Sequence, residues 1–165
     1  MIFLELSGKA LGMAKKYWLM KSEPETYSIS HLQKDKKTWW TGVRNYQARN
    51  FMMNDMNIGD EILFYHSNAE PPGVAGLARV SKKAEPDATQ FDKKSEVFDP
   101  KASKEKPIWF CVEVEFVAEF KNFVSLETLK ETKSLEGMQV LKKGQRLSVQ
   151  PATKAEFDQV KKLGS

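Results

Sequence analysis

Residues 109–120 constrain the fold more than any other part of this 165-residue sequence. Apolar residues occupy every second position from Phe110 onward, and Glu113 and Glu115 lie between them. Successive side chains of a β-strand point to opposite faces of its sheet, so this spacing predicts a strand with one buried face. A chain with such a strand must provide a sheet and a second layer to cover that face.

Four other segments also have the pattern of strands. Residues 17–20 are a short aromatic-rich apolar run, and residues 61–66 alternate in character after a Gly-Asp turn. A Pro-Pro-Gly turn precedes residues 74–80, where Gly73 and Gly76 indicate that another backbone or a ligand approaches closely. Residues 146–150 are the predicted last strand.

Helices are predicted where a capping residue precedes apolar residues at helical spacing. Ser28, Asn45 and Ser125 are expected to begin helices, the second of which extends through residue 56. Thr153 and Glu156 match a capping box ahead of the C-terminal helix. Residues 34–37 are expected to form a charged turn, residues 84–106 a long polar excursion, and residues 135–141 a short element of either type.

Strands and helices therefore mix without regular alternation, which predicts an α+β fold around a small curved sheet or barrel. The length fits one domain, expected over residues 14–165, with residues 1–13 as an N-terminal extension outside the fold. Cys111 is the single cysteine, and no segment is apolar for long enough to span a membrane. We expect a reducing, cytoplasmic location and a monomer.

The inventory of reactive residues argues against catalysis. Two histidines and one cysteine provide no usual metal-ligand spacing, and no phosphate-binding glycine loop occurs. His66 and Ser67 are adjacent on a predicted strand, so their side chains point to opposite faces and cannot act as base and nucleophile. Cys111 has apolar neighbours and is expected to be structural. We therefore expect a non-enzymatic protein with no cofactor and no metal.

Residues 39–50 combine aromatic rings with amide and guanidinium groups. Aromatic faces stack on nucleic-acid bases, and amides or arginines bond base edges and phosphates. The net charge of +4 permits such a partner, although scattered lysines fit a solvated surface equally well. From the residues alone the segment also fits a buried core with a capped helix, a small-molecule pocket or a protein-binding face.

Several separated blocks of the sequence resemble the EVE domain family. They are YWLMKSEP at 17–24, WTGVRNYQARN at 40–50, GD at 59–60, FYHS at 64–67, GVAG at 73–76 and RLSVQ at 146–150. The resemblance implies a PUA-like fold, with a mixed barrel of about five or six strands and surrounding helices, related to the YTH readers of methylated adenine. It also implies a non-catalytic reader of modified bases, such as methylated or hydroxymethylated cytosine in DNA or a modified RNA base.

The same resemblance implies a set of base-binding positions. They are Lys21, Ser22, Trp40, Arg44, Asn45, Tyr46, Gln47, Arg49, Tyr65, His66, Ser67, Arg146 and Ser148. We expect Trp40 or Tyr65 to stack on the base, and Asn45 and Ser22 to bond its edge. The expected phosphate contacts come from Lys21, Arg44 and Arg49.

Two other functions stay open at this point. PUA-like proteins include enzymes, and Lys21 in a concave site could act as a base or nucleophile on a modified nucleoside or small molecule. The excursion at residues 84–106 could instead bind another protein.

Overall fold

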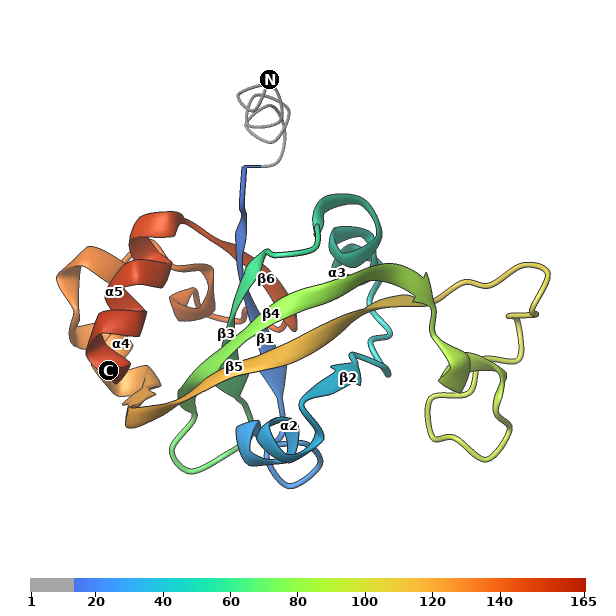
Figure 1. Cartoon of the computed structure of the whole chain (residues 1–165), viewed down its shortest axis with the longest axis horizontal. Coiled ribbons are helices and arrows are strands. Elements are labelled where there is room, and N and C mark those ends of the chain that lie inside the picture. The colour runs from blue at the N-terminus through green and yellow to red at the C-terminus, as the bar shows by residue number, and fades with distance from the viewer. Residues whose placement is uncertain (1–13) are drawn as a thin grey trace, which may run out of the picture.

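A six-stranded mixed sheet organises residues 14–165, the part of the chain that the computed structural model describes (Figure 1). The strands lie in the order β2-β5-β4-β3-β1-β6, with β1 and β3 parallel and all other neighbours antiparallel. They are β1 (Tyr17–Ser22), β2 (Lys37–Trp39), β3 (Glu61–His66), β4 (Gly73–Pro86), β5 (Phe110–Ser125) and β6 (Val149–Ala152). The N-terminal extension expected at residues 1–13 lies outside the described residues.

The α+β class is confirmed, but the sheet does not close into the expected barrel. β2 and β6 are its two edges, and they are three and four residues long. Within residues 14–165, β2 pairs only with β5 and β6 pairs only with β1. The two edges do not pair with each other, so the sheet is open.

The helices begin where the capping residues predicted. They are α2 (Ile29–Asp35), α3 (Tyr46–Asn50), α4 (Leu126–Glu131) and α5 (Lys154–Gly164). A side-chain oxygen of Ser28, Asn45, Ser125 or Thr153 accepts a hydrogen bond from the amide three residues later. The helix expected over residues 45–56 is α3 followed by a π-helical turn, Phe51–Asp55.

Two hydrophobic clusters lie on opposite faces of the sheet, because neighbouring residues of β1 and β3 alternate between them. Trp18 and Phe64 belong to the first cluster, which α2 and α3 complete. Leu19 and Leu63 belong to the second cluster, which α4 and α5 cover, and Phe157 of α5 lies in it. The predicted apolar stripe of the last helix thus packs on the sheet.

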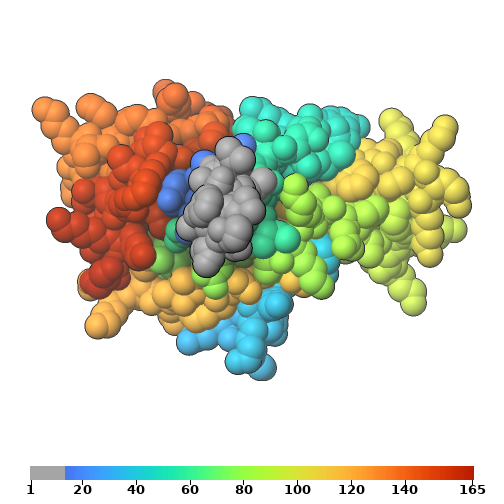
Figure 2. Space-filling view, turned by 45° about the horizontal axis from the view of Figure 1, so that its top comes forward, coloured from blue at the N-terminus to red at the C-terminus, as the bar shows by residue number. Residues whose placement is uncertain are grey.

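β4 and β5 are longer than predicted and form a hairpin that extends beyond the rest of the sheet (Figure 1). β4 continues to Pro86, so the first residues of the predicted excursion are strand, and register shifts let the two strands bend together. Residues 87–109 close the hairpin and protrude from the molecule (Figure 2). Buried Gln90 holds their two ends together, because its amide bonds the backbone of Asp87, Ile108 and Trp109.

Three other expectations differ from the structure. Residues 34–37 were expected to form a charged turn, but Lys37 begins an edge strand, Lys37–Trp39, which pairs with residues 113–115 of β5. The last strand begins at Val149 rather than at Arg146. Residues 135–141 contribute to two short 3-10 turns, Lys133–Leu135 and Gln139–Leu141. The two strands depend on pairing with distant parts of the chain, whereas the 3-10 turns are held by local backbone hydrogen bonds.

Gly76 provides a test of the close backbone approach that the sequence predicted. A Cβ atom there would collide with the carbonyl oxygen of Ala118 and lie 2.9 Å from Cγ1 of Ile29. We expect Gly76→Ala to lower the free energy of unfolding by about 1–3 kcal/mol, the usual cost of overpacking. Urea denaturation measures it, with Gly137→Ala as the control, because the nearest atom to its added Cβ is 3.8 Å away. Equal stability of the two variants would contradict this packing.

Candidate nucleic-acid interface

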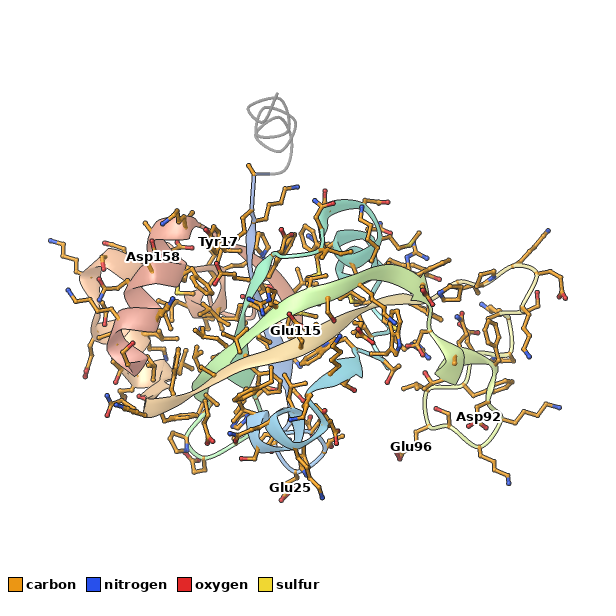
Figure 3. The ribbon with its side chains drawn as sticks, viewed as in Figure 1. Tyr17, Glu25, Asp92, Glu96, Glu115 and Asp158 are labelled. Carbon is orange, nitrogen blue, oxygen red and sulfur yellow. The ribbon has the colours of Figure 1, made fainter. Side chains whose placement is uncertain are left out.

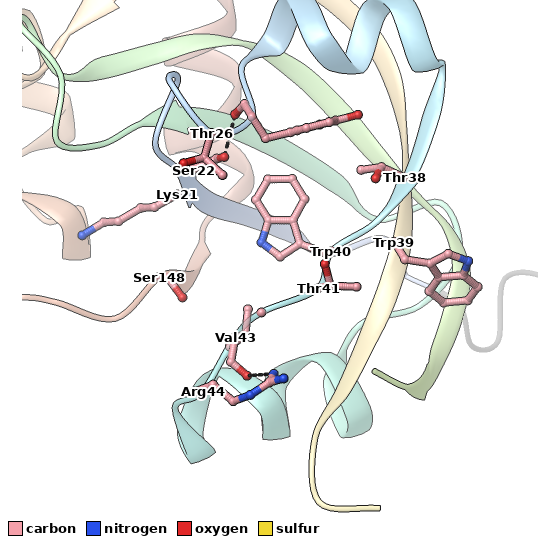
Figure 4. Close-up of a pocket in the computed structure, with 12 residues that line it drawn as sticks. Lys21, Ser22, Thr26, Thr38, Trp39, Trp40, Thr41, Val43, Arg44 and Ser148 are labelled. Carbon is pink, nitrogen blue, oxygen red and sulfur yellow. Dashed lines mark hydrogen bonds between the residues drawn. The ribbon is translucent and has the colours of Figure 1, made fainter. Parts of the chain in front are cut away.

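A pocket of about 410 Å³ lies at the C-terminal end of β1, between that strand, β2 and the loop before α3 (Figure 4). This volume is in the range of small-molecule sites. Among the described residues its lining includes hydroxyl groups and two cations but no carboxylate. The lining residues are Lys21, Ser22, Thr26, Tyr27, Thr38, Trp39, Trp40, Thr41, Gly42, Val43, Arg44 and Ser148. We call it the Trp40 pocket.

Trp40 provides a fixed aromatic wall. Its ring packs edge-to-face on Phe64, with centroids 5.4 Å apart, and only 8% of the residue is exposed. Its backbone amide donates to the carbonyl oxygen of Val112 at 2.9 Å, which ties the loop to the sheet. The neighbouring indole of Trp39 points away from it, toward Lys82 (Figure 4). The two adjacent tryptophans therefore have different surroundings.

Arg44 is held entirely by protein groups. Its guanidinium donates to the carboxylate of Asp87 at 3.1 Å, to the hydroxyl of Thr89, to the carbonyl of Val43 and twice to the carbonyl of Val97. These bonds use all five of its N–H donors. Arg44 thus ties the pocket loop to the excursion, and no donor is left for the phosphate contact that we expected.

Asp87 is the buried partner of this arrangement, with 1% of the residue exposed. Its carboxylate also accepts from the amide of Gly42 at 2.7 Å. Burial alone would raise the pKa of Asp87, but hydrogen bonds from Thr89, Gly42 and Arg44 outweigh burial and hold that pKa below its ordinary value. A charged carboxylate therefore fixes the glycine of the pocket loop, where Gly42 adopts a φ of +90°.

Lys21, at the end of β1, lines another part of the pocket than Arg44 does (Figure 4). Its Nζ atom donates to the carbonyl oxygen of Gln145 at 3.3 Å and lies 5.9 Å from the ring centroid of Tyr65. Burial lowers its pKa. No ion pair of Lys21 occurs within residues 14–165, so its ammonium keeps two donors for a ligand.

The structure brings five of the expected site residues together in the Trp40 pocket. They are Lys21, Ser22, Trp40, Arg44 and Ser148. The sequence analysis did not single out Tyr27 or Thr38, which line the same pocket, or Asp87, which braces it. Tyr27 lies five residues after Ser22, and Thr38 lies two residues before Trp40, so closeness in sequence to expected site residues was the available signal for these two. Asp87 gave no local signal, because it lies 43 residues beyond Arg44 in the sequence.

The residues expected at the start of α3 lie outside the pocket lining. The side chain of Asn45 caps the helix by accepting from Ala48 N at 2.9 Å, and Gln47 is exposed. Tyr46 is 59% exposed and stacks on Trp109, with ring centroids 4.8 Å apart. Arg49 lies over the Tyr46 ring and donates to the carbonyl of Ile108 at 2.8 Å.

The remaining expected residues lie behind or beside the pocket. Tyr65 is 4% exposed and belongs to the cluster on the other face of the sheet from Trp40. Ser67 donates its amide to the carbonyl of Ser22 at 3.0 Å. Arg146 is exposed in the turn before Ser148. Trp40 and Tyr65 were the two residues expected to stack on the base, and of these only Trp40 lines the pocket.

His66 accepts a hydrogen bond at Nε2 from the amide of Ile29, 3.2 Å away, so its neutral form supports α2. Burial lowers the pKa of His66 below 6.5, and the Glu119 carboxylate offsets this in part. The unfolded chain therefore binds the proton more tightly. Stability should be complete above about pH 6.5 and fall as the pH drops through 6.5 toward the folded-state pKa.

Urea midpoints at pH 7.5 and pH 5.5 test this. Between these two pH values we expect the parent to lose more stability than His66→Gln, because the variant has no ionisable side chain at position 66. An identical loss in both proteins would contradict the assignment of the neutral histidine.

Cys111 is buried, and burial raises its pKa to about 12, with a further contribution from the Asp87 carboxylate. Within the described chain, no group of three or more His, Cys, Asp or Glu side chains could hold a metal ion. No helix in residues 14–165 has the length and apolarity needed to cross a membrane.

An open α+β sheet that carries an aromatic, hydroxyl-lined pocket defines a small binding domain. The chain belongs to the EVE domain family, whose model matches residues 16–163, so the family resemblance is confirmed. Thymocyte nuclear protein 1 of Homo sapiens is 45% identical over 166 residues, covering 89% of this chain and 73% of that protein. The corresponding protein of Rattus norvegicus is also 45% identical, over 161 residues, covering 86% of this chain and 70% of that protein.

Solved structures of similar proteins agree with this family assignment. The structure of the human THYN1 protein in complex with DNA containing 5-methylcytosine has a TM-score of 0.85 and 43% identity, covering 92% of this chain and 98% of that one. A hypothetical protein from Leishmania major has a TM-score of 0.87 and 47% identity, covering 92% of this chain and 95% of the other. An ASCH protein from Zymomonas mobilis, at 14% identity and a TM-score of 0.55, shares the fold alone.

Proposed function

We propose that this protein is a reader of modified bases in DNA, which holds a methylated or hydroxymethylated cytosine in the Trp40 pocket without changing it chemically. The observation that carries this proposal is the immobilised indole of Trp40 in a pocket lined by hydroxyl groups. The likeness to a protein solved with 5-methylcytosine DNA supports the choice of DNA over RNA.

The roles of the pocket residues follow from their chemistry. Trp40 stacks on the base, which has been turned out of the duplex. The hydroxyl of Ser22 donates to the carbonyl of Tyr27 at 2.6 Å, so its lone pairs are left to accept from an exocyclic amine. Ser148 faces it across the pocket (Figure 4). Lys21 bonds a base oxygen or a phosphate.

The residues outside the pocket take supporting roles in this proposal. Arg44 braces the pocket loop, and Asn45 caps α3. Arg49 uses three N–H donors within the described chain, which leaves two for a phosphate. Exposed Tyr46 beside it can stack on a neighbouring base. We propose that the protein acts as a monomer and without a cofactor, and the cytoplasmic location stays a prediction.

Fluorescence anisotropy of labelled oligonucleotides at a fixed low salt concentration tests the proposal. Matched strands carry one cytosine, 5-methylcytosine or 5-hydroxymethylcytosine, as single strands and duplexes, in DNA and in RNA. We expect one modified form in DNA to bind more tightly than plain cytosine, and single strands to bind at least as well as duplexes, because unpairing costs a few kcal/mol. Weak, salt-sensitive and equal binding to every form would contradict it.

The enzyme alternative has one specific observation in its favour, the partly buried Lys21 with its lowered pKa. A lowered pKa increases the fraction of a lysine that is a neutral amine, and a neutral amine can attack a carbonyl or accept a proton. Mass spectrometry of modified oligonucleotides incubated with the protein separates the two functions. A reader returns the base unchanged, whereas any new nucleoside mass that disappears with Lys21→Met would replace this proposal by an enzymatic one.

A further inference from the structure

Residues 142–146 form a basic turn on the rim of the Trp40 pocket. Two hydrogen bonds join Lys21 of β1 to this part of the chain. The Nζ atom of Lys21 donates to the carbonyl oxygen of Gln145 at 3.3 Å, and its amide donates to the carbonyl oxygen of Ser148, just after the turn, at 2.9 Å. Both Lys21 and Ser148 line the pocket. The turn therefore lies beside the opening through which a base would enter.

The backbone gives the basic turn a defined shape. Gln145 N donates to the carbonyl of Lys142 at 3.2 Å, and Gly144 adopts a φ of +74°, which places glycine at the third position of a β-turn. Leu147 follows the turn and is buried in the core with 7% exposed. Lys142, Lys143 and Arg146 are exposed, so the turn is anchored at its base while its three cations reach solvent.

The charge around this turn is positive without local compensation. No aspartate or glutamate occurs between Gly137 and Ala155 in the sequence. None of the three cations forms an ion pair within the described residues 14–165. An uncompensated group of cations on one rim raises the local concentration of a polyanion at that rim.

The excursion, which Arg44 ties to the pocket loop, has a different balance of charge. Residues 84–106 contain five lysines but six acidic residues, a net charge of 5 − 6 = −1. Two of the acidic residues, Asp92 and Glu96, lie on the outer part of the excursion (Figure 3). A phosphodiester chain that enters the pocket therefore meets attraction on the side of the basic turn and none from the net charge of the excursion.

We propose that the basic turn binds the phosphates that flank the base held in the Trp40 pocket, so that the DNA strand runs along residues 142–146 rather than over the excursion. This inference rests on the proposed function. A nucleotide that enters base first leaves its own phosphates at the pocket mouth, where Lys142, Lys143 and Arg146 can replace the counterions of the backbone.

The salt dependence of binding measures these contacts. In the triple variant Lys142→Gln/Lys143→Gln/Arg146→Gln, we expect the slope of log affinity against log salt concentration to become less steep by about 2. We assume three phosphate contacts, each of which contributes about 0.7 to the slope for single-stranded DNA. The ratio of affinities for modified and plain cytosine should stay as in the parent, because phosphates carry no base information.

The matched control removes three exposed lysines from the helices on the other face of the sheet, as Lys130→Gln/Lys161→Gln/Lys162→Gln. Its slope should equal that of the parent, and Lys142→Arg/Lys143→Arg should keep the parent slope because it keeps the charge. A parent that prefers a modified base, with an unchanged slope in the first triple variant, overturns this inference alone. A parent without any base preference removes the proposed function and this inference with it.

Discussion

Replacing Trp40 with alanine is expected to abolish the preference for a modified base. Stacking of one base on an aromatic side chain contributes about 1–3 kcal/mol, so affinity for the modified oligonucleotide should fall by roughly 5- to 150-fold, to the level of plain cytosine. The measurement is the anisotropy titration with matched single strands. Trp40 is a wall of the pocket and is held by Phe64, so its ring is already in place for the base.

Stability has to be checked in the same experiment, because Trp40 is mostly buried and its truncation leaves a cavity. Trp40→Phe keeps a ring in the pocket and should retain part of the preference. Trp39→Ala is the comparison: Trp39 also lines the pocket, but its indole points away from Trp40, so its loss should lower the preference much less than the loss of Trp40. A folded Trp40→Ala protein that still prefers the modified base would exclude stacking on this residue.

A large loss of stability is expected from Asp87→Ala. The change removes the acceptor of Arg44, Gly42 and Thr89 at once and leaves the guanidinium without its counter-charge. Removing one partner of a buried ion pair costs about 3–5 kcal/mol, and we expect about 3 kcal/mol because the Arg44 side chain is 20% exposed. Urea denaturation measures the loss.

Asp158→Ala is the control for Asp87→Ala. It also removes an aspartate from an ion pair, with Lys154 at 2.7 Å, but both side chains are more than half exposed. Exposed pairs contribute little, so stability should hardly change. If Asp87→Ala were as stable as Asp158→Ala, the brace between the pocket loop and the excursion would have no energetic importance.

Features set by neighbouring residues could be predicted from the sequence. A cap needs only an oxygen that reaches an amide three residues on, so Ser28 and Thr153 were sufficient to place their helices. β3 was predicted from Glu61 to His66, as observed, because its alternation and its turn residues are local. The family blocks predicted that the C-terminal end of the first strand borders the site, as observed for β1, but the barrel that they implied is an open sheet.

Features that depend on distant partners could not be predicted. Lys37–Trp39 is a strand only because residues 113–115 offer it an edge. The role of Arg44 depends on Asp87 and Val97, which are 43 and 53 residues away, and an arginine in a basic, aromatic segment looks the same whether it binds a phosphate or a buried carboxylate. Asn45 was expected both to cap α3 and to bond the edge of a base. Its side-chain oxygen accepts the capping hydrogen bond from Ala48 N, so that oxygen is already in use.

The excursion has two parts that differ in how they are attached. Up to Asp99 it is tied to the body, through Arg44, through Gln90 and through the indole of Trp109. From residue 100 to residue 107, the hydrogen bonds within the described chain are to one another and to Asp99. A dye or a peptide tag inserted at Ser103 would therefore leave the wall of the pocket in place, which makes this protruding tip a suitable position for a label.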